Sequence, residues 1–167
     1  MPGALTGRER SAAPLTTPTP PGEKPTYRHL GQFVGALMRA AVAEEWDDAA
    51  SIPATGPAIV VSNHVSYADV LAVGRYLIWS GRWPRYIGKA ELWKIPGIAW
   101  LARRCRQIPV ERGTDRAKDA LVHALAALAQ GELVAIYPEG GRTHDPQLWP
   151  QRGRTGVARL ALATHAP

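Results

Sequence analysis

The sequence predicts an α/β fold with a mainly parallel central sheet flanked by helices. Short β-branched apolar runs alternate along the chain with longer segments of helical periodicity, as in sheets whose strands are joined by crossover helices. Two polar motifs each directly follow such a run, and open α/β sheets bind their ligands at these positions. The 167 residues suffice for one domain with a substantial core.

The beginning of the chain differs in character from the rest. Residues 1–26 contain six prolines and show no apolar periodicity, so we predict a disordered tail there. A single domain is expected over residues 27–167, and it starts with an amphipathic helix at 29–43. After the last predicted helix the alternation calls for another strand. We therefore expect the domain to be incomplete at its C-terminus.

Turn and capping residues place the other elements. The predicted strands are residues 58–62, 85–87, 107–110 and 132–137. Ser66 and Asp69 have the spacing of a capping box, which predicts a helix over 67–79. The further predicted helices are 91–104, interrupted at Pro96 and Gly97, then 115–130 with Thr114 as its cap, and a last one from Thr155 or Gly156.

Several classes of protein are disfavoured by composition. The single cysteine, Cys105, excludes an internal disulfide and fits a reducing compartment. No apolar run approaches the roughly 20 residues that span a bilayer, and we expect no spanning helix. The N-terminus lacks the pattern of a signal peptide. His144 and Asp145 do not belong to a cluster with metal-ligand spacing, so no metal site is predicted.

The positive charge of the chain is concentrated in one stretch. Residues 82–116 contain nine Lys or Arg and three Asp or Glu, which equals the net +6 of the whole chain, and Trp83, Trp93 and Trp100 lie there with Trp79 just before. Aromatic and basic residues together are typical of proteins at an anionic membrane surface. They also occur in nucleic-acid sites, but no such fold signature is visible. A core helix with a basic outer face is the remaining alternative. We favour peripheral membrane contact and expect no nucleic-acid partner.

His64 and Asp69 follow the first predicted strand and are candidates for a catalytic pair. On a regular helix, residues five apart lie about 140° from one another and share no face. They can meet if His64 lies in the turn before the helix and folds back. Asp69 would then accept a hydrogen bond from one ring nitrogen and leave the other as the base. The alternative is that Asp69 only caps the helix and His64 is a loop histidine.

A second group of candidates offers an anion site. Glu139, Gly140 and Arg142 follow the strand at 132–137; glycine lets a ligand approach the backbone, and the arginine fork matches phosphate oxygens. Lys89 and Arg112 also follow predicted strands, and a parallel sheet would bring them to the same edge. A solvated turn and ordinary surface charges are the alternatives. A base beside an anion clamp suggests transfer chemistry on a phosphate-bearing substrate.

Three ordered motifs within residues 53–167 resemble those of the 1-acyl-glycerol-3-phosphate acyltransferases, a family within the lysophospholipid acyltransferases. NHVSYAD at 63–69 resembles the first motif, N-H-x-x-x-x-D, and YPEGGRT at 137–143 resembles the third, F-P-E-G-T-R-S. QIPVER at 107–112 is similar to the second, G-x-I-P-V-x-R, although Arg106 stands where a glycine is usual. KAEL at 89–92 looks like the lysine-containing segment between the first two motifs.

The resemblance implies a glycerolipid-acyltransferase-like fold and a role for each matching residue. His64 would deprotonate the free hydroxyl of 1-acyl-glycerol-3-phosphate, and Asp69 would orient His64. The site for the acceptor phosphate would comprise Lys89, Arg112, Glu139, Gly140 and Arg142. The implied donor is acyl-CoA or acyl-carrier protein, with no metal or other cofactor. The product would be phosphatidic acid in phospholipid biosynthesis, made by an enzyme peripheral to the cytoplasmic face of the plasma membrane.

Other functions stay open on the sequence. The acceptor could be another lysolipid, a glycolipid or glycerol 3-phosphate, because acceptor choice depends on the shape of the pocket. The chain could also be a non-catalytic basic domain that binds membranes or nucleic acid, or an inactive fragment.

Overall fold

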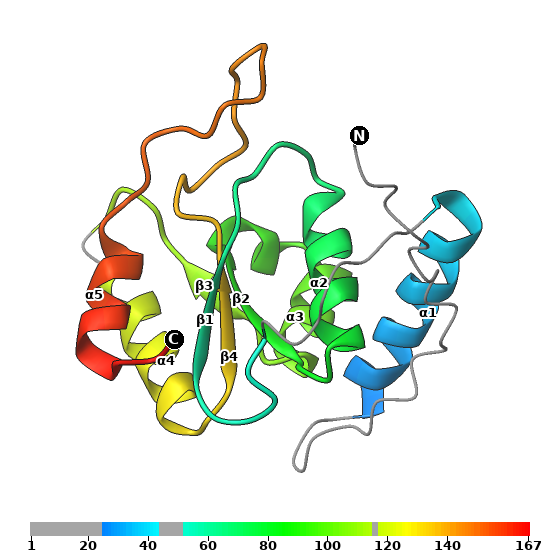
Figure 1. Ribbon diagram of the computed structural model, residues 1–167, viewed down its shortest axis with the longest axis horizontal. Coiled ribbons are helices and arrows are strands. Elements are labelled where there is room, and N and C mark those ends of the chain that lie inside the picture. Colours follow the sequence, from blue (N-terminus) through cyan, green and yellow to red (C-terminus); the bar gives the residue numbers. More distant parts are fainter. Residues whose placement is uncertain (1–24, 44–51, 115–116) are drawn as a thin grey trace, which may run out of the picture.

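The computed structural model describes residues 25–43, 52–114 and 117–167. A four-stranded sheet forms its centre in the order β1-β4-β2-β3, and each neighbouring pair of strands is parallel. Helices cover both faces of this sheet (Figure 1). The predicted α/β fold with a parallel central sheet is therefore confirmed. The strands are β1 (Ala58–Val61), β2 (Pro84–Lys89), β3 (Ile108–Val110) and β4 (Leu133–Ile136).

The helices match the predicted order and differ at their ends. They are α1 (Pro25–Ala41), α2 (Asp69–Trp79), η2 (Ala90–Lys94), α3 (Pro96–Arg104), α4 (Ala117–Ala129) and α5 (Gly156–Thr164). Because α1 begins at Pro25, the last two residues of the predicted tail are helical; the rest of that tail lies outside the described residues, as do residues 115–116 before α4. The expected interruption at Pro96 separates η2 from α3, and a proline is tolerated at the first position of a helix.

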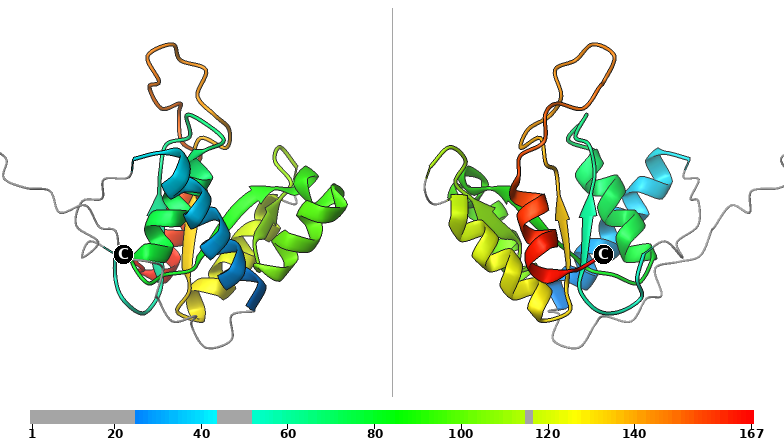
Figure 2. Two further views of the ribbon diagram at one scale, coloured as in Figure 1. Left: turned by 90° about the vertical axis from the view of Figure 1, so that its right-hand side faces the viewer. Right: turned by 60° about the vertical axis from the view of Figure 1, so that its left-hand side comes forward.

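Successive residues of the strands face opposite helical layers. Val134 belongs to one buried cluster with Leu160 of α5, while Leu133 belongs to another with Leu77 of α2. Figure 2 shows the resulting layers, with α4 and α5 on one side of the sheet and α1 and α2 on the other. This alternation follows from the period of two along a strand.

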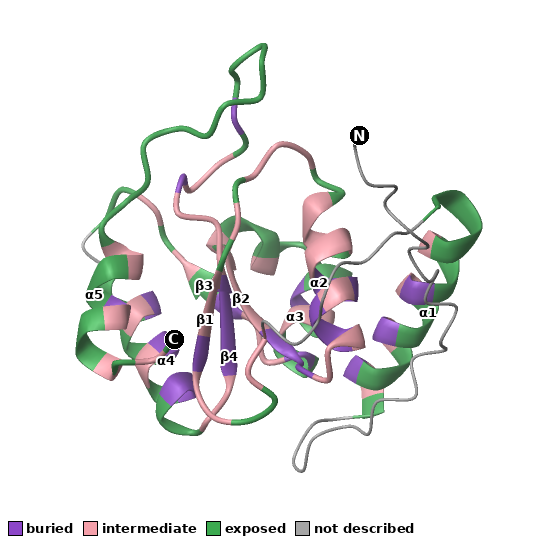
Figure 3. Ribbon diagram, viewed as in Figure 1, coloured by how far each residue is buried: buried purple, intermediate pink, exposed green. Residues whose placement is uncertain are grey.

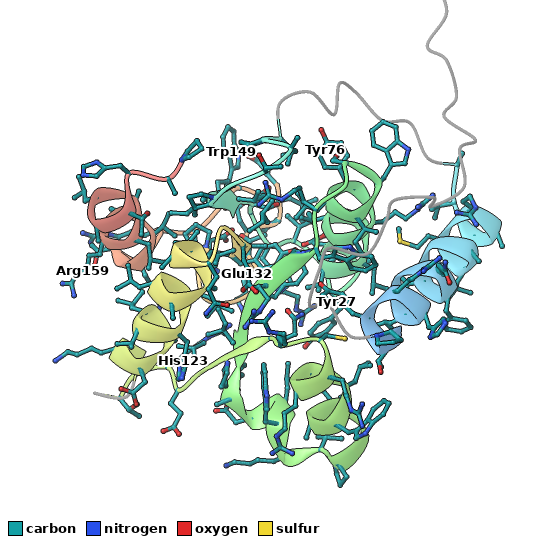
Figure 4. The ribbon with its side chains drawn as sticks, turned by 90° about the horizontal axis from the view of Figure 1, so that it is seen from below. Tyr27, Tyr76, His123, Glu132, Trp149 and Arg159 are labelled. Atoms are coloured by element: carbon teal, nitrogen blue, oxygen red, sulfur yellow. The ribbon has the colours of Figure 1, made fainter. Side chains whose placement is uncertain are left out.

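Helix α1 packs on the domain through one face and leaves the other exposed (Figure 3). Its Tyr27 points toward the body of the domain (Figure 4), where its hydroxyl donates to the carbonyl of Pro84 at 2.6 Å. The ring of Tyr27 lies edge-on to that of Trp83, with centroids 4.7 Å apart. Gly31 permits the close approach, since a Cβ there would lie 3.1 Å from the Trp83 ring. Trp83 is therefore a core residue, 6 % exposed.

The basic stretch at 82–116 is only partly a surface. Arg82 is buried and donates to the backbone carbonyls of Pro53, Gly56 and Gly131, which ties together the turns before β1 and β4. Burial lowers the pKa of this guanidinium. Arg85 of β2 forms an ion pair with Glu132, the residue directly before β4, and so connects these two neighbouring strands. These two cations hold the fold together, so the charge available to a membrane is smaller than the sequence count suggests.

The backbone conformation of Arg106 gives a reason for the glycine that is usual at this position of the second acyltransferase motif. Its φ is +55°, in the left-handed region that glycine enters without a Cβ clash. The side chain compensates in this chain, because Arg106 Nη1 lies 2.7 Å from Glu132 Oε1. The turn before β3 is therefore kept despite the substitution.

Candidate active site

The parallel sheet brings all the predicted site segments to one edge. The register aligns Val61 of β1 with Ile136 of β4, so the loops that follow these strands start side by side. Lys89 ends β2 and pairs with Val110 of β3, which places Arg112 two residues beyond the same edge. The loop after β4 rises above this edge in Figure 1. The structure thus assembles segments that are up to 75 residues apart.

The turn after β1 brings His64 and Asp69 into contact. His64 Nδ1 lies 3.0 Å from Asp69 Oδ2, and both side chains are largely buried, at 14% and 17% exposure. The turn is shaped by the same carboxylate oxygen, which accepts the N–H groups of Val65 at 2.6 Å and Ser66 at 2.8 Å. These bonds hold residues 65 and 66 out of the helix, and α2 accordingly begins at Asp69 rather than at the predicted residue 67.

The contacts of Asp69 determine the chemistry of the imidazole. Burial alone would raise the pKa of the Asp69 carboxyl, but hydrogen bonds from Ser66, His64 and Val65 outweigh it and keep that pKa below 3.8. Asp69 is therefore ionised near neutral pH and can only accept. His64 must then carry its proton on Nδ1, which leaves Nε2 with a free lone pair. The pair is thus arranged as a base held in one tautomer by a carboxylate.

Glu139 braces the two loops together. Its Oε1 accepts the backbone N–H of His64 at 2.9 Å, and its Oε2 accepts that of Gln151 at 2.8 Å. The backbone N–H of Thr143 also donates to the carbonyl of His64 at 2.7 Å. Glu139 is only 9% exposed and lines neither of the two cavities described below. In this structure its carboxylate binds backbone rather than facing a phosphate position, which differs from the direct role that the resemblance implies.

Tyr137 is a site residue that sequence reasoning passed over. Its ring stacks on that of His64, with centroids 4.4 Å apart, and lies parallel to that of Tyr86 at 6.3 Å. It therefore fixes the plane of the imidazole from the side of β4. Burial, followed by the charge of Asp69, raises the pKa of the Tyr137 hydroxyl, so the phenol stays protonated. The only sequence signal was its place as the aromatic residue that opens the third motif.

A cavity of about 680 Å³ opens beside His64, between the sheet and α1, α2, η2 and α3. Most of its wall is apolar, with Leu30, Val70, Ile78, Trp93 and Leu101 among the lining residues. Lys89, Arg112 and Arg142 also line it. The cavity therefore combines a mostly apolar wall with a base and several cations.

The predicted cations occupy different places around this cavity. Arg142 is exposed and its guanidinium lies 4.1 Å from the ring centroid of Tyr67, a cation–π contact that holds it beside the turn of His64. Lys89 is also exposed and is 3.7 Å from Glu91. Arg112 is half-buried and lines both this cavity and a second one. Gly140 lines only the second cavity. Thus His64, Lys89, Arg112 and Arg142 share one cavity, Asp69 supports His64, and Gly140 faces the other cavity.

The described residues form neither a metal-ligand cluster nor a membrane-spanning helix. Among residues 25–43, 52–114 and 117–167, no group of three or more His, Cys, Asp or Glu could hold a metal ion. No helix of these residues has the length and apolar character needed to cross a bilayer.

Comparison with known proteins gives the class to which this α/β chain belongs. The profile of the family described as Acyltransferase matches residues 45–167, so the chain belongs to this family. No curated protein matches the sequence significantly.

A particular relative is found among solved structures. The fold is similar to the crystal structure of the 1-acyl-sn-glycerophosphate (LPA) acyltransferase PlsC from Thermotoga maritima, with a TM-score of 0.64. The identity is 24%, and the match covers 84% of this chain and 56% of that protein. The chain thus spans a little over half the length of PlsC, and at this identity the likeness shows a shared fold.

Proposed function

We propose that this chain transfers a fatty acyl group from an acyl thioester to the free hydroxyl of 1-acyl-glycerol-3-phosphate, giving phosphatidic acid. The observation that carries the proposal is the His64–Asp69 pair, 3.0 Å apart, whose histidine lines a large, mostly apolar cavity together with Arg142 and Lys89. The base, the apolar space and the cations match the three parts of such an acceptor: its hydroxyl, its chain and its phosphate.

In the proposed reaction, His64 Nε2 takes the proton from the acceptor hydroxyl as its oxygen attacks the thioester carbonyl carbon. The tetrahedral intermediate then breaks its carbon–sulfur bond, and the proton on Nε2 passes to the leaving thiolate. Asp69 stays ionised throughout and stabilises the imidazolium through its bond to Nδ1. All the groups in this scheme belong to the chain or its substrates, so the proposal includes no metal or other cofactor.

Arg142 and Lys89 are proposed to bind the acceptor phosphate. Both are exposed cations on the cavity that contains His64, so a phosphate near them would keep the neighbouring hydroxyl close to the base. The contact with the Tyr67 ring holds the Arg142 guanidinium beside the cavity, where its fork could bind two phosphate oxygens. Glu139 supports this site indirectly, through the loop that carries Arg142.

Peripheral contact with an anionic membrane is also proposed. The proposed surface contains only part of the tryptophan-rich stretch at 82–116 and includes residues of α1. Near the apolar cavity, large apolar side chains are exposed on α1 and around η2 and α3: Phe33 (68%), Leu37 (54%), Ile95 (49%), Ile98 (42%) and Trp100 (53%). Lys94, Arg103 and Arg104 are exposed on the same segments. Such a surface would bind lipid through both apolar insertion and charge. The cytoplasmic face of the plasma membrane is proposed as the location because a phospholipid acceptor resides there.

The deciding experiment is an acyltransfer assay with His64→Ala and a matched control. A general base contributes roughly a hundredfold to ten-thousandfold in rate, so His64→Ala should lose at least that much. His123→Ala, an exposed histidine on α4, should behave as the wild type. A panel of acceptors would compare 1-acyl-glycerol-3-phosphate with other lysolipids, a glycolipid and glycerol 3-phosphate. Normal turnover by His64→Ala would refute the role of the pair. Tight binding to anionic vesicles or nucleic acid without any turnover would favour a non-catalytic domain.

A further inference from the structure

A second cavity lies on the opposite face of the sheet from the apolar one. Its volume is about 230 Å³, and its walls come from β3, α4, the loop after β4 and the start of α5. The two cavities meet at the carboxyl edge of the sheet, where Ile87, Arg112 and Tyr137 line both. Because Tyr137 stacks on His64, the second cavity adjoins the candidate catalytic pair.

Positive side chains surround this second cavity. Four cations line it, namely Arg112, Lys118, Arg154 and Arg159, and no aspartate or glutamate is among its described lining residues. Arg159 projects from α5 (Figure 4). Burial and then the like charge of Arg154 lower the pKa of Arg112, against a smaller opposite effect of Glu91. Cations gathered without a carboxylate between them repel one another, and a bound anion would relieve that repulsion.

The loop after β4 is built to place Arg154 at this cavity. The backbone N–H of Arg154 donates to the carbonyl of Pro138 at 2.9 Å, which folds the returning chain against the third motif. The Arg154 side chain then lies across Gly140, whose φ is +73°. A Cβ at position 140 would lie 2.9 Å from Arg154 Nε, so any larger residue there would displace this side chain from its place. The glycine of the motif thus makes space for a cation outside the motif.

We propose that this cationic cavity binds the phosphate groups of a coenzyme A thioester, as a donor subsite separate from the acceptor phosphate site at Arg142 and Lys89. The identity of the donor rests on the proposed function. A reaction between two phosphate-bearing substrates needs a second anion site, and the second cavity shares with the first the residue Tyr137, which stacks on His64. The concave shape favours the phosphates of a small nucleotide over the convex surface of a carrier protein.

The test uses a matched pair of substitutions in one loop, each of which removes one positive charge. Arg154→Gln removes a cation from the cavity, and Arg152→Gln removes an exposed cation two residues away that lines neither cavity. Calorimetric titration with adenosine 3′,5′-bisphosphate and with free coenzyme A measures binding without turnover. Arg154→Gln should weaken both by about tenfold or more, the effect of losing one charge-assisted hydrogen bond, and Arg152→Gln should match the wild type. Circular dichroism on each variant would verify the fold.

Steady-state kinetics then separate the two substrates. Arg154→Gln should raise KM for the acyl-CoA and leave KM for the acceptor unchanged, while Arg154→Lys should recover part of the loss. Equal affinities for Arg154→Gln and Arg152→Gln would overturn the proposal, as would a rise in the acceptor KM alone. So would a loss confined to acyl-carrier protein as donor. If the wild type binds the bisphosphate through Arg154 but acylates no acceptor, the subsite stands and the proposed function fails.

Discussion

Asp69, the first residue of α2, and Glu139, in the loop after β4, are carboxylates that both contact His64. Asp69 accepts from the ring nitrogen, whereas Glu139 accepts from the backbone N–H of the same residue. The first contact sets which ring nitrogen is basic; the second sets where the backbone of His64 lies relative to β4. Two carboxylates therefore act on one histidine in different ways: Asp69 sets which ring nitrogen carries the proton, and Glu139 sets the position of the backbone.

Asp69→Asn should have the largest effect, on rate. The backbone N–H groups of Val65 and Ser66 favour the amide oxygen at the place of Oδ2, so Nδ1–H would keep an acceptor but the imidazolium formed in the reaction would lose its ionised partner. We expect kcat to fall by roughly a hundredfold to ten-thousandfold, comparable to His64→Ala. Acyltransfer assays at saturating substrate would measure it. A variant with nearly normal kcat would mean that Asp69 serves only to hold the turn.

Arg142→Lys should have an intermediate effect that depends on the acceptor. Lysine keeps the charge but not the fork, so kcat/KM for 1-acyl-glycerol-3-phosphate should fall about tenfold to a hundredfold. The uncharged monoacylglycerol should be much less affected, and Arg152→Lys serves as the exposed control. An equal loss on both acceptors would argue that Arg142 supports the loop that Glu139 braces and does not bind phosphate.

Glu139→Gln should act mainly on stability. One oxygen of the carboxylate would be replaced by an amide nitrogen that faces a backbone N–H, either of His64 or of Gln151. We expect a loss of about 1–3 kcal/mol in the free energy of unfolding and less than a tenfold loss in kcat. Urea denaturation would measure the first, with exposed Glu91→Gln as the control. A large loss of kcat at unchanged stability would instead place Glu139 in substrate binding.

The smallest expected effect is on the pH dependence of stability. The pKa of Asp69 is lower in the folded than in the unfolded chain, so its contribution is present above the unfolded pKa and is lost as pH falls through the folded value. The difference in unfolding free energy between the wild type and Asp69→Asn should therefore be constant near neutral pH and shrink below pH 3.8. A difference that persists unchanged in acid would show that the charge of Asp69 does not stabilise the turn.

Local patterns of the sequence were sufficient for the fold and for much of the candidate site. Strand and helix periods and the breaker at Pro96 predicted the described elements to within a few residues, because these signals act over one or two turns of chain. The capping box expected at Ser66 is not the cap of α2, whose N-cap is Ala68 without a side-chain hydrogen bond. A parallel sheet then brought the loops after β1, β2, β3 and β4 to one edge without further information. The pairing of His64 with Asp69 needed only a local turn, and the residue spacing allowed it.

Contacts between distant segments could not be predicted in the same way. Arg82 and Trp83 looked like members of a membrane surface, yet Arg82 binds a carbonyl 49 residues away and Trp83 packs against α1. Arg154 showed no motif at all; its place beside Gly140 depends on the path of the returning loop.

The sequence by itself determined the order of the elements, the edge at which the site forms and the types of residue that gather there. Only the tertiary structure decided which groups each residue contacts. The sequence assigned Asp69 to a pair with His64 and Glu139 to an anion site, and in the structure Glu139 instead accepts the backbone N–H groups of His64 and Gln151. The physical reason is that a polar side chain takes its role from the donor or charge that it meets when buried, and here those partners lie up to 75 residues away.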